Sequence, residues 1–252
     1  MTEAIVFMKI FQFFAVALIL SGVISCKKME VPATSNVSNA DAAAMIGGST
    51  ALNSYGVYSN SSDITVNAAL QAALNIPGCG LSKTDTIIRH STAGASVTYN
   101  YSLYYNHKLN CNTSNAPDNI TGNLTYNGNY NNSNLSLTNS GSFSYTLAGL
   151  TATPTVYTLN GEYKSSGTFK LKADTTNTGT VSFDFVLKNV TISKTTQYFT
   201  GGTGTVIVTG TTTKKGDFTY NGTLTINSGS LATLVLNGTI YQVNLVLGTI
   251  NP

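Results

Sequence analysis

Strict alternation of apolar and polar side chains is the feature that most constrains how this chain can fold. In residues 97–111, VTYNYSLYYNHKLNC, one set of alternate positions holds Val97, Tyr99, Tyr101, Leu103, Tyr105, His107, Leu109 and Cys111. A period of two residues is typical of a β-strand with one buried face. From about residue 84 to the end, similar segments follow one another with short Gly-, Asn- and Ser-rich breaks. This arrangement favours hairpin connections and an antiparallel meander.

The expected strands are long. They cover residues 84–91, 95–111, 119–131, 133–149, 154–173, 178–198, 203–213, 216–228, 231–236 and 239–250. Several exceed the usual strand length of about 5–6 residues, and long strands in a single sheet must coil. We therefore expect a mainly β fold, a long-stranded antiparallel meander that forms a strongly curved sheet, a half-barrel or a barrel.

An Asn-Gly pair recurs in four similar segments, TYNGNY (125–130), TLNGEY (158–163), TYNGTL (219–224) and VLNGTI (235–240). Asn-Gly is the strongest short hairpin signal, so four turns would be the simplest interpretation. Parity argues against three of them, because a change of phase by one residue moves every following side chain to the other face. Apolar residues stay on one face only if the strand continues through the pair. We therefore predict that Gly128, Gly161 and Gly222 are mid-strand glycines on the apolar face.

Asn237–Gly238 differs from the other three pairs. A two-residue turn here places Ala232 opposite Val243 and Leu234 opposite Tyr241, apolar against apolar. We predict a true hairpin at this pair. A change of phase inside residues 181–192 predicts a β-bulge near Lys188–Asn189.

One helix is expected, near residues 63–75, DITVNAALQAALN. Val66, Leu70 and Leu74 lie at i, i+4 and i+8 and form an apolar stripe, and Pro77–Gly78 would end the helix. We expect this stripe to pack on one face of the sheet. A helix that plugs a ligand cavity is the functional alternative.

The N-terminal segment indicates export. An apolar run within residues 8–25 ends in Val23-Ile24-Ser25-Cys26, which resembles the lipobox of bacterial lipoproteins. The resemblance implies that residues 1–25 are a signal peptide, with translation starting at Met1 or Met8. It also implies that Cys26 becomes the acylated first residue of the mature protein. Two or more acyl chains on this residue would anchor the protein stably in a membrane. The alternative is an uncleaved membrane anchor with an incidental cysteine.

The rest of the chain is expected to form a tether over residues 26–60, rich in Ser, Asn, Ala and Gly, and a single β-rich domain over residues 61–252. The lipobox, a second pair of cysteines and a Thr/Asn-rich meander closing on LNGTIYQVNL resemble uncharacterised β-rich lipoproteins of the Bacteroidota. That resemblance implies a location in the cell envelope, at the outer membrane. Lys27 and Lys28 depart from the acidic residues that often follow the lipidated cysteine of surface-exported members, so the periplasmic and surface sides both stay open.

Cys79 and Cys111 remain once Cys26 is assigned to lipid. An even pair in an exported chain indicates a disulfide, and two free thiols are the alternative. A zinc site with His107 is excluded by geometry. His107 and Cys111 are four residues apart on a strand, about 13 Å, which is too far for two ligands of one metal bonded at about 2.0–2.3 Å. We expect no metal and no cofactor.

Composition limits the functions that the chain can have. Charged residues make up 9% of it and the net charge is +3, against roughly 25% charged residues in typical soluble domains. So few basic residues give no nucleic-acid-binding face. Acidic groups are also sparse, and the spacing of Glu162, Asp184 and Asp217 does not indicate a catalytic pair. We therefore expect a protein that is not an enzyme.

The expected function is a lipid-anchored module that binds a glycan or an apolar ligand, and the candidate ligand face is Tyr99, Tyr101 and Tyr105. A dry cavity would favour a lipid, whereas exposed tyrosines would favour a glycan. The alternative is a structural or adhesive envelope protein in which the same tyrosines form the core. A glycan-cleaving enzyme is the least favoured interpretation.

Overall fold

The computed structural model describes residues 37–74, 78–133, 135–172, 178–213 and 216–252. All of them belong to one compact unit, Ser35–Pro252. The expected signal peptide, Cys26 and the first part of the expected tether lie outside the described residues.

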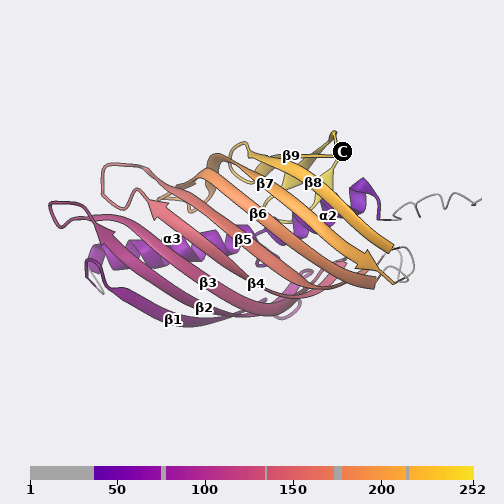
Figure 1. Cartoon of the computed structure of the whole chain (residues 1–252), viewed down its shortest axis with the longest axis horizontal. Helices are drawn as coiled ribbons and strands as arrows, with labels where there is room; N and C mark the ends of the chain where they lie inside the picture. The colour runs from indigo at the N-terminus through magenta and orange to yellow at the C-terminus, as the bar shows by residue number, and fades with distance from the viewer. Residues whose placement is uncertain (1–36, 75–77, 134, 173–177, 214–215) are drawn as a thin grey trace, which may run out of the picture. The chain divides into compact units, whose positions relative to one another are not determined.

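The sheet has eleven strands, and each pairs antiparallel with the next one in the sequence (Figure 1). They are β1 (Ser82–His90), β2 (Thr98–Cys111), β3 (Pro117–Asn131), β4 (Leu135–Ala148), β5 (Val156–Leu171), β6 (Thr178–Ser193), β7 (Phe199–Thr212), β8 (Gly216–Ile226), β9 (Leu231–Leu236), β10 (Thr239–Asn244) and β11 (Ile250–Asn251). The prediction of a mainly β antiparallel meander is confirmed.

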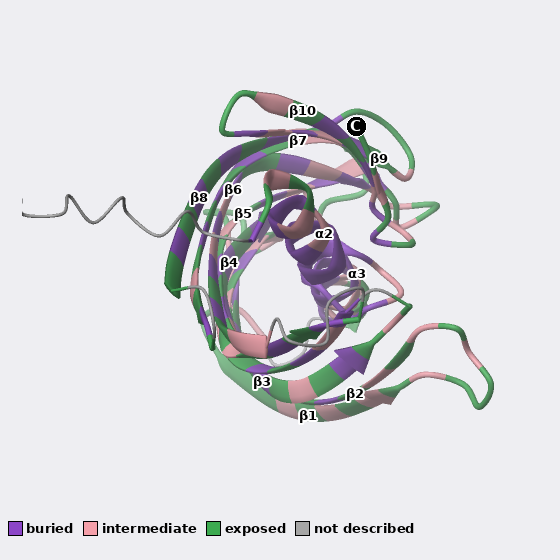
Figure 2. Ribbon diagram, turned by 90° about the vertical axis from the view of Figure 1, so that its right-hand side faces the viewer, coloured by how far each residue is buried: buried purple, intermediate pink, exposed green. Residues whose placement is uncertain are grey.

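The expected strong curvature is wrong, because the sheet is neither closed nor strongly curled. β1 and β11 stand at the two ends of the strand order. Two helices, α2 (Asn39–Thr50) and α3 (Val57–Leu74), lie along one face of the sheet (Figure 2). A sheet whose apolar face is covered by helices does not have to close on itself to bury that face.

Helix α2 corrects the prediction of a tether over residues 26–60. Residues 26–60 were expected to be a tether, but α2 falls inside this range and residues 42–43 and 45–51 are buried. Ser38 caps α2 in a reciprocal capping box with Asp41. Small residues let α2 pack closely, since a Cβ at Gly48 would lie 2.2 Å from the Tyr130 hydroxyl oxygen. A helix buried almost all round shows no amphipathic stripe, which explains why periodicity did not indicate it.

The orientation of α3 is a second correction. The helix contains the expected span, but Val66, Leu70 and Leu74 are 45, 56 and 64% exposed and do not pack on the sheet. The buried face includes Ile64, Ala68 and the polar residue Gln71. Hydrogen bonds decide this orientation, because Gln71 contacts His107 of β2 and the Thr65 hydroxyl donates to Gln197 Oε1 at 2.5 Å.

The predictions for the Asn-Gly pairs are confirmed. Gly128, Gly161 and Gly222 lie inside β3, β5 and β8. Asn237 and Gly238 form the turn between β9 and β10, with φ of 47° and 82°. Their register places Leu234 opposite Tyr241 and Ala232 opposite Val243, as expected.

The predicted bulge is also confirmed. The pairing of β6 with β7 shifts between Lys188 and Thr191. Asn189, between them, has φ of 51°. A bulge of this kind changes the phase of the strand, which explains why the buried positions of β6 change parity there.

Close packing at Gly128 gives a prediction. An added Cβ would lie 2.2 Å from the backbone oxygen of Asn100 and 2.3 Å from the Tyr101 ring, so Gly128→Ala should lower the free energy of unfolding by about 1–3 kcal/mol. Gly201→Ala is the control, since its Cβ would meet only the Thr191 hydroxyl, at 3.3 Å. Urea denaturation of both variants measures the difference. Equal stability of the two would contradict the described packing.

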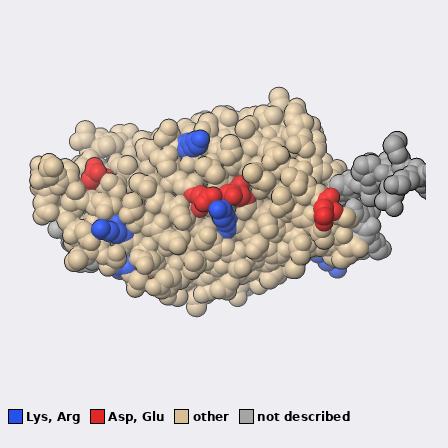
Figure 3. All heavy atoms as spheres, in the orientation of Figure 1, with Lys and Arg blue, Asp and Glu red and all other residues tan. Residues whose placement is uncertain are grey.

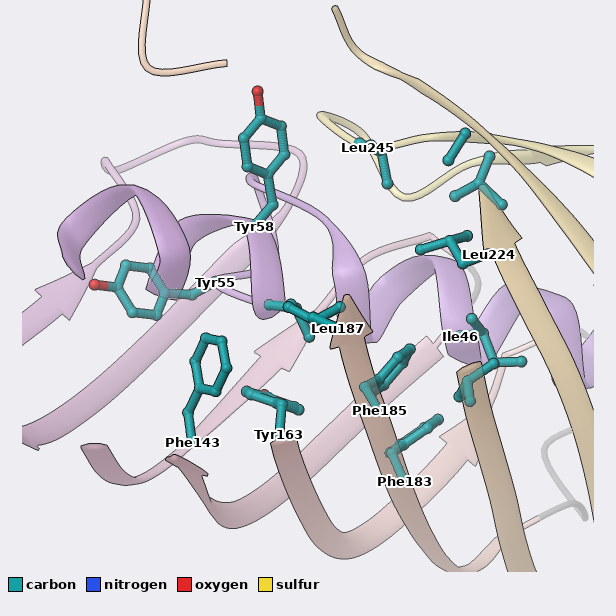
Figure 4. Close-up of a cluster of buried hydrophobic side chains, with 14 of the residues drawn as sticks. Ile46, Tyr55, Tyr58, Phe143, Tyr163, Phe183, Phe185, Leu187, Leu224 and Leu245 are labelled. Carbon is teal, nitrogen blue, oxygen red and sulfur yellow. The ribbon is translucent and has the colours of Figure 1, made fainter. Parts of the chain in front are cut away.

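We call the face of the sheet that α2 and α3 cover the inner face. Aromatic side chains fill it (Figure 4). The Tyr163 ring lies 5.7 Å from Phe143 and 6.0 Å from Phe185, centroid to centroid. Met45 and Ile46 of α2 and Tyr58 and Ile64 of α3 complete the core from the helix side; all four are at most 2% exposed. The polar positions of the strands therefore point to the opposite face.

Candidate functional site: the solvent face of the sheet

The predicted tyrosine ligand face lies mostly in the core. Tyr101 and Tyr105 are 3 and 0% exposed, and only Tyr99 is partly accessible. Tyr55, which precedes α3, places its ring 5.5 Å from Tyr99 and 5.7 Å from Tyr101. The prediction is therefore wrong for Tyr101 and Tyr105. Alternation shows which residues share a face of the strand, but it does not show that helices cover this face.

Polar groups fasten α3 over these tyrosines. Arg89 of β1 forms an ion pair with Asp63 of α3, with 3.0 Å between Nη2 and Oδ1, and the Tyr55 hydroxyl donates to the same carboxylate. Burial raises the pKa of Tyr105, and the charge of Asp63 raises it further. The Tyr105 hydroxyl thus keeps its proton, and the ion pair between Arg89 and Asp63 ties α3 to β1.

His107 gives a pH-dependence prediction. Burial lowers its pKa and the charge of Lys83 lowers it further, against an opposing effect of Asp85. The unfolded chain therefore binds the proton more readily, and stability should fall as the pH drops through the unfolded pKa of about 6.5 and below it. Denaturation at pH 7.5 and 5.0 should show a smaller loss in His107→Gln than in the wild type. His90→Gln is the control for removing an exposed histidine, and an equal loss in all three proteins would contradict this role.

Cys79 and Cys111 form a disulfide with a Cα–Cα distance of 5.4 Å, which confirms the prediction. The bond closes the segment of residues 79–111, which contains β1 and β2. The described part of the chain holds no group of three or more His, Cys, Asp or Glu side chains that could bind a metal ion.

The solvent face of the sheet carries rows of uncharged polar side chains. Because paired strands place partner residues side by side, register fixes each row. One row crosses seven strands without an ionisable residue: Ser102, Asn127, Ser140, Ser166, Ser182, Thr209 and Thr219. The adjacent row holds Asn100, Asn129, Thr138, Thr168, Thr180 and Thr211, between His90 of β1 and Asp217 of β8. Figure 3 shows a face with very few charges.

Four shallow depressions connect along this face, and we call them the outer trough. The first, about 400 Å³, is lined by residues that include Ser140, Ser166 and Ile207. The second, about 430 Å³, shares Ser140 and Ser166 with it. A third, about 490 Å³, shares Thr138 and Thr168 with the second, and a fourth, about 450 Å³, shares Ile207 with the first. The outer trough therefore runs over β3 to β9.

A small charged cluster lies in the first depression. Lys164 Nζ is 2.8 Å from Glu162 Oε1 and 3.9 Å from Asp184 Oδ2. The hydrogen bond to Glu162 raises the pKa of Lys164. One positive and two negative charges leave the cluster with a net charge of −1. Asp217 lies apart from it on β8, where the Thr211 hydroxyl donates to its carboxylate.

The three acidic residues considered for catalysis are therefore only partly brought together. Glu162 and Asp184 share Lys164 on an open sheet face, and their carboxylates are neutralised in part by the same ammonium group. The outer trough cannot be recognised from the sequence alone. The sequence does show Ser, Thr and Asn residues that alternate with the apolar ones, but the rows that they form depend on the register between each strand and the next.

The chain matches no known protein family, no curated protein and no solved structure. Among the helices that the structure describes, none combines the length and the apolar character needed to cross a membrane.

Proposed function

We propose that this protein is a non-catalytic, lipid-anchored protein of the bacterial cell envelope, held at the outer membrane through Cys26, that binds a neutral glycan in the outer trough. The observation that carries the proposal is the contiguous surface of Ser, Thr and Asn side chains over β3 to β9, where Lys164, Asp184 and Lys170 are the only charged residues among those that line the four depressions. Hydroxyl and amide groups there can both donate to and accept from the hydroxyl groups of a sugar.

The shape of the trough supports an extended ligand. Neighbouring strands lie about 4.8 Å apart, so six spacings from β3 to β9 span about 29 Å. A single hydrogen bond made in exchange for water contributes only about 0.5–1.5 kcal/mol. Useful affinity therefore requires many parallel contacts along a glycan chain, which a long shallow surface can provide.

The filled inner face argues against the apolar-ligand version of the prediction. Large side chains from both helices and the sheet occupy the space where such a ligand would lie. The same observation favours a second candidate function, a structural or adhesive envelope protein without a small-molecule ligand. The two candidates differ in whether an isolated glycan binds.

Native electrophoresis in gels that contain a soluble polysaccharide tests the glycan proposal. We expect slower migration in at least one neutral polymer among xyloglucan, galactomannan and dextran. Unchanged migration in all three neutral polymers would favour the structural candidate and contradict glycan binding.

Cell fractionation tests the anchor. We expect the wild type in the membrane fraction and Cys26→Ala in the soluble or secreted fraction, because acyl chains on Cys26 would supply the attachment. Protease treatment of intact cells then distinguishes the cell surface from the periplasmic side. Equal membrane association of Cys26→Ala would contradict lipidation and indicate an uncleaved N-terminal anchor.

A further inference from the structure

The apolar stripe of α3 has no partner within the described part of the chain. Val66, Leu70 and Leu74 are among the most exposed large apolar side chains of the molecule. Val66 and Leu70 each follow a buried residue, Ile64 and Ala68, by two positions. Successive helix residues are about 100° apart, so the stripe points about 200° away from the buried face. It therefore lies on the side of the helix that faces away from the sheet.

The C-terminal part of α3 lies beside the edge strand β1. Gln71 of α3 contacts His107, and His107 is paired with Lys83 of β1. Leu81, two residues before Lys83, is 57% exposed. We call Val66, Leu70, Leu74, Leu81 and Lys83 the helix-side strip. It combines apolar side chains with Lys83 at its margin, and Asp85 lies beside Lys83 on the same face of β1.

The charge around the helix-side strip fits a lipid surface. The segment Val57–Leu74 contains no Lys or Arg, and its one acidic residue, Asp63, is paired with Arg89. Lys83 and Asp85, two residues apart on the same face of β1, offset each other in charge, so the strip is apolar and its margin carries no net charge. Exposed Val and Leu side chains without a net charge around them suit the interface of a bilayer, where apolar groups enter the acyl boundary.

Chain length places this surface within reach of a membrane. The first described residue, Val37, is eleven residues after Cys26. Eleven residues span at most about 40 Å when fully extended. We propose that the helix-side strip rests on the lipid bilayer to which the chain is anchored, an inference that depends on the proposed lipidation of Cys26.

This contact would orient the proposed binding site. The helices cover one face of the sheet (Figure 2), and the residues that line the outer trough belong to the other face. With the helix-side strip on the bilayer, the outer trough faces away from the membrane, toward the glycan. A short tether together with a weak second contact also holds the module in one orientation more effectively than either does alone.

Site-directed fluorescence tests the contact. The lipidated protein, with nitrobenzoxadiazole attached through Leu70→Cys, is placed in vesicles of phosphatidylethanolamine and phosphatidylglycerol that contain nitroxide-labelled lipid. Ser140→Cys, labelled in the same way, reports on the outer trough. We expect several-fold stronger quenching at position 70 than at position 140. Adding Leu74→Glu to the position 70 reporter should reduce its quenching.

The outcomes separate the two proposals. Equal, weak quenching at both positions on vesicle-bound protein would overturn the membrane contact and leave the anchor standing. Equal vesicle binding by the Cys26→Ala form would overturn the anchor. A shielded but unquenched label at position 70, with a dimer in light scattering, would show that a second copy covers the strip and would overturn the inference.

Discussion

Phe143→Ala is expected to lower the free energy of unfolding by about 3–5 kcal/mol. The Phe143 ring is fully buried, 5.8 Å from the Tyr145 ring and 5.7 Å from the Tyr163 ring, centroid to centroid. Helices close the inner face above it, so the neighbouring rings can fill the lost volume only in part. The loss should appear in urea denaturation as a lower midpoint with an unchanged slope.

Tyr104→Ala is the matched control for this aromatic deletion. Tyr104 lies one residue from the buried positions of β2, on the opposite face, and is 47% exposed. Its replacement should change the free energy of unfolding by about 0.5 kcal/mol or less. Similar losses at positions 104 and 143 would contradict the assignment of the two faces.

Loss of the Cys79–Cys111 disulfide should have an effect of similar size. The two cysteines are 32 residues apart in the sequence. A loop of that length restricts the unfolded chain by about 3–4 kcal/mol on the chain-entropy model. The double variant Cys79→Ala/Cys111→Ala should unfold at a correspondingly lower urea concentration.

Reduction provides an independent check on the same bond. Dithiothreitol should lower the stability of the wild type toward that of the double variant and leave the double variant unchanged. Reduction that destabilised the double variant equally would show that the measured effect does not come from this disulfide.

The alternation of apolar and polar residues gave correct predictions where strand pairing alone decides the structure. The continuation of β3, β5 and β8 through Gly128, Gly161 and Gly222 followed from keeping apolar residues on one face. The register of the β9–β10 hairpin followed from the same requirement. In each case the choice lay between two phases, and only one of them buries the apolar set.

The helices could not be predicted in the same way. α2 is buried almost all round and consists largely of small residues, so it shows no stripe. In α3 a strong stripe was present but pointed outward, because Gln71 and Thr65 make polar contacts with the sheet side. Covering the inner face with helices then removed the need for the curvature that long strands had suggested, and buried Tyr101 and Tyr105.

The outer trough escaped prediction for a related reason. Ser140 and Ser166 are far apart in the sequence and come together only through the register of β4 and β5. Composition indicated a neutral polar surface, but only pairing of the strands shows where that surface is continuous.

Binding by two matched double variants tests the central claim, that a neutral glycan binds in the outer trough. Thr138 and Thr168 are directly opposite each other in the trough. Thr138→Lys/Thr168→Glu should keep the sheet paired through a cross-strand ion pair while removing two neutral polar groups. Thr84 and Asn106, a directly opposite pair on β1 and β2, receive Lys and Glu as the control.

The measurement is the dissociation constant for whichever neutral polysaccharide retards the wild type. Losing two hydrogen bonds at about 0.5–1.5 kcal/mol each predicts weakening of at least about five-fold for Thr138→Lys/Thr168→Glu. The control variant should bind like the wild type. Equal affinity of all three proteins, with both variants folded, would contradict the claim that the outer trough is the binding site.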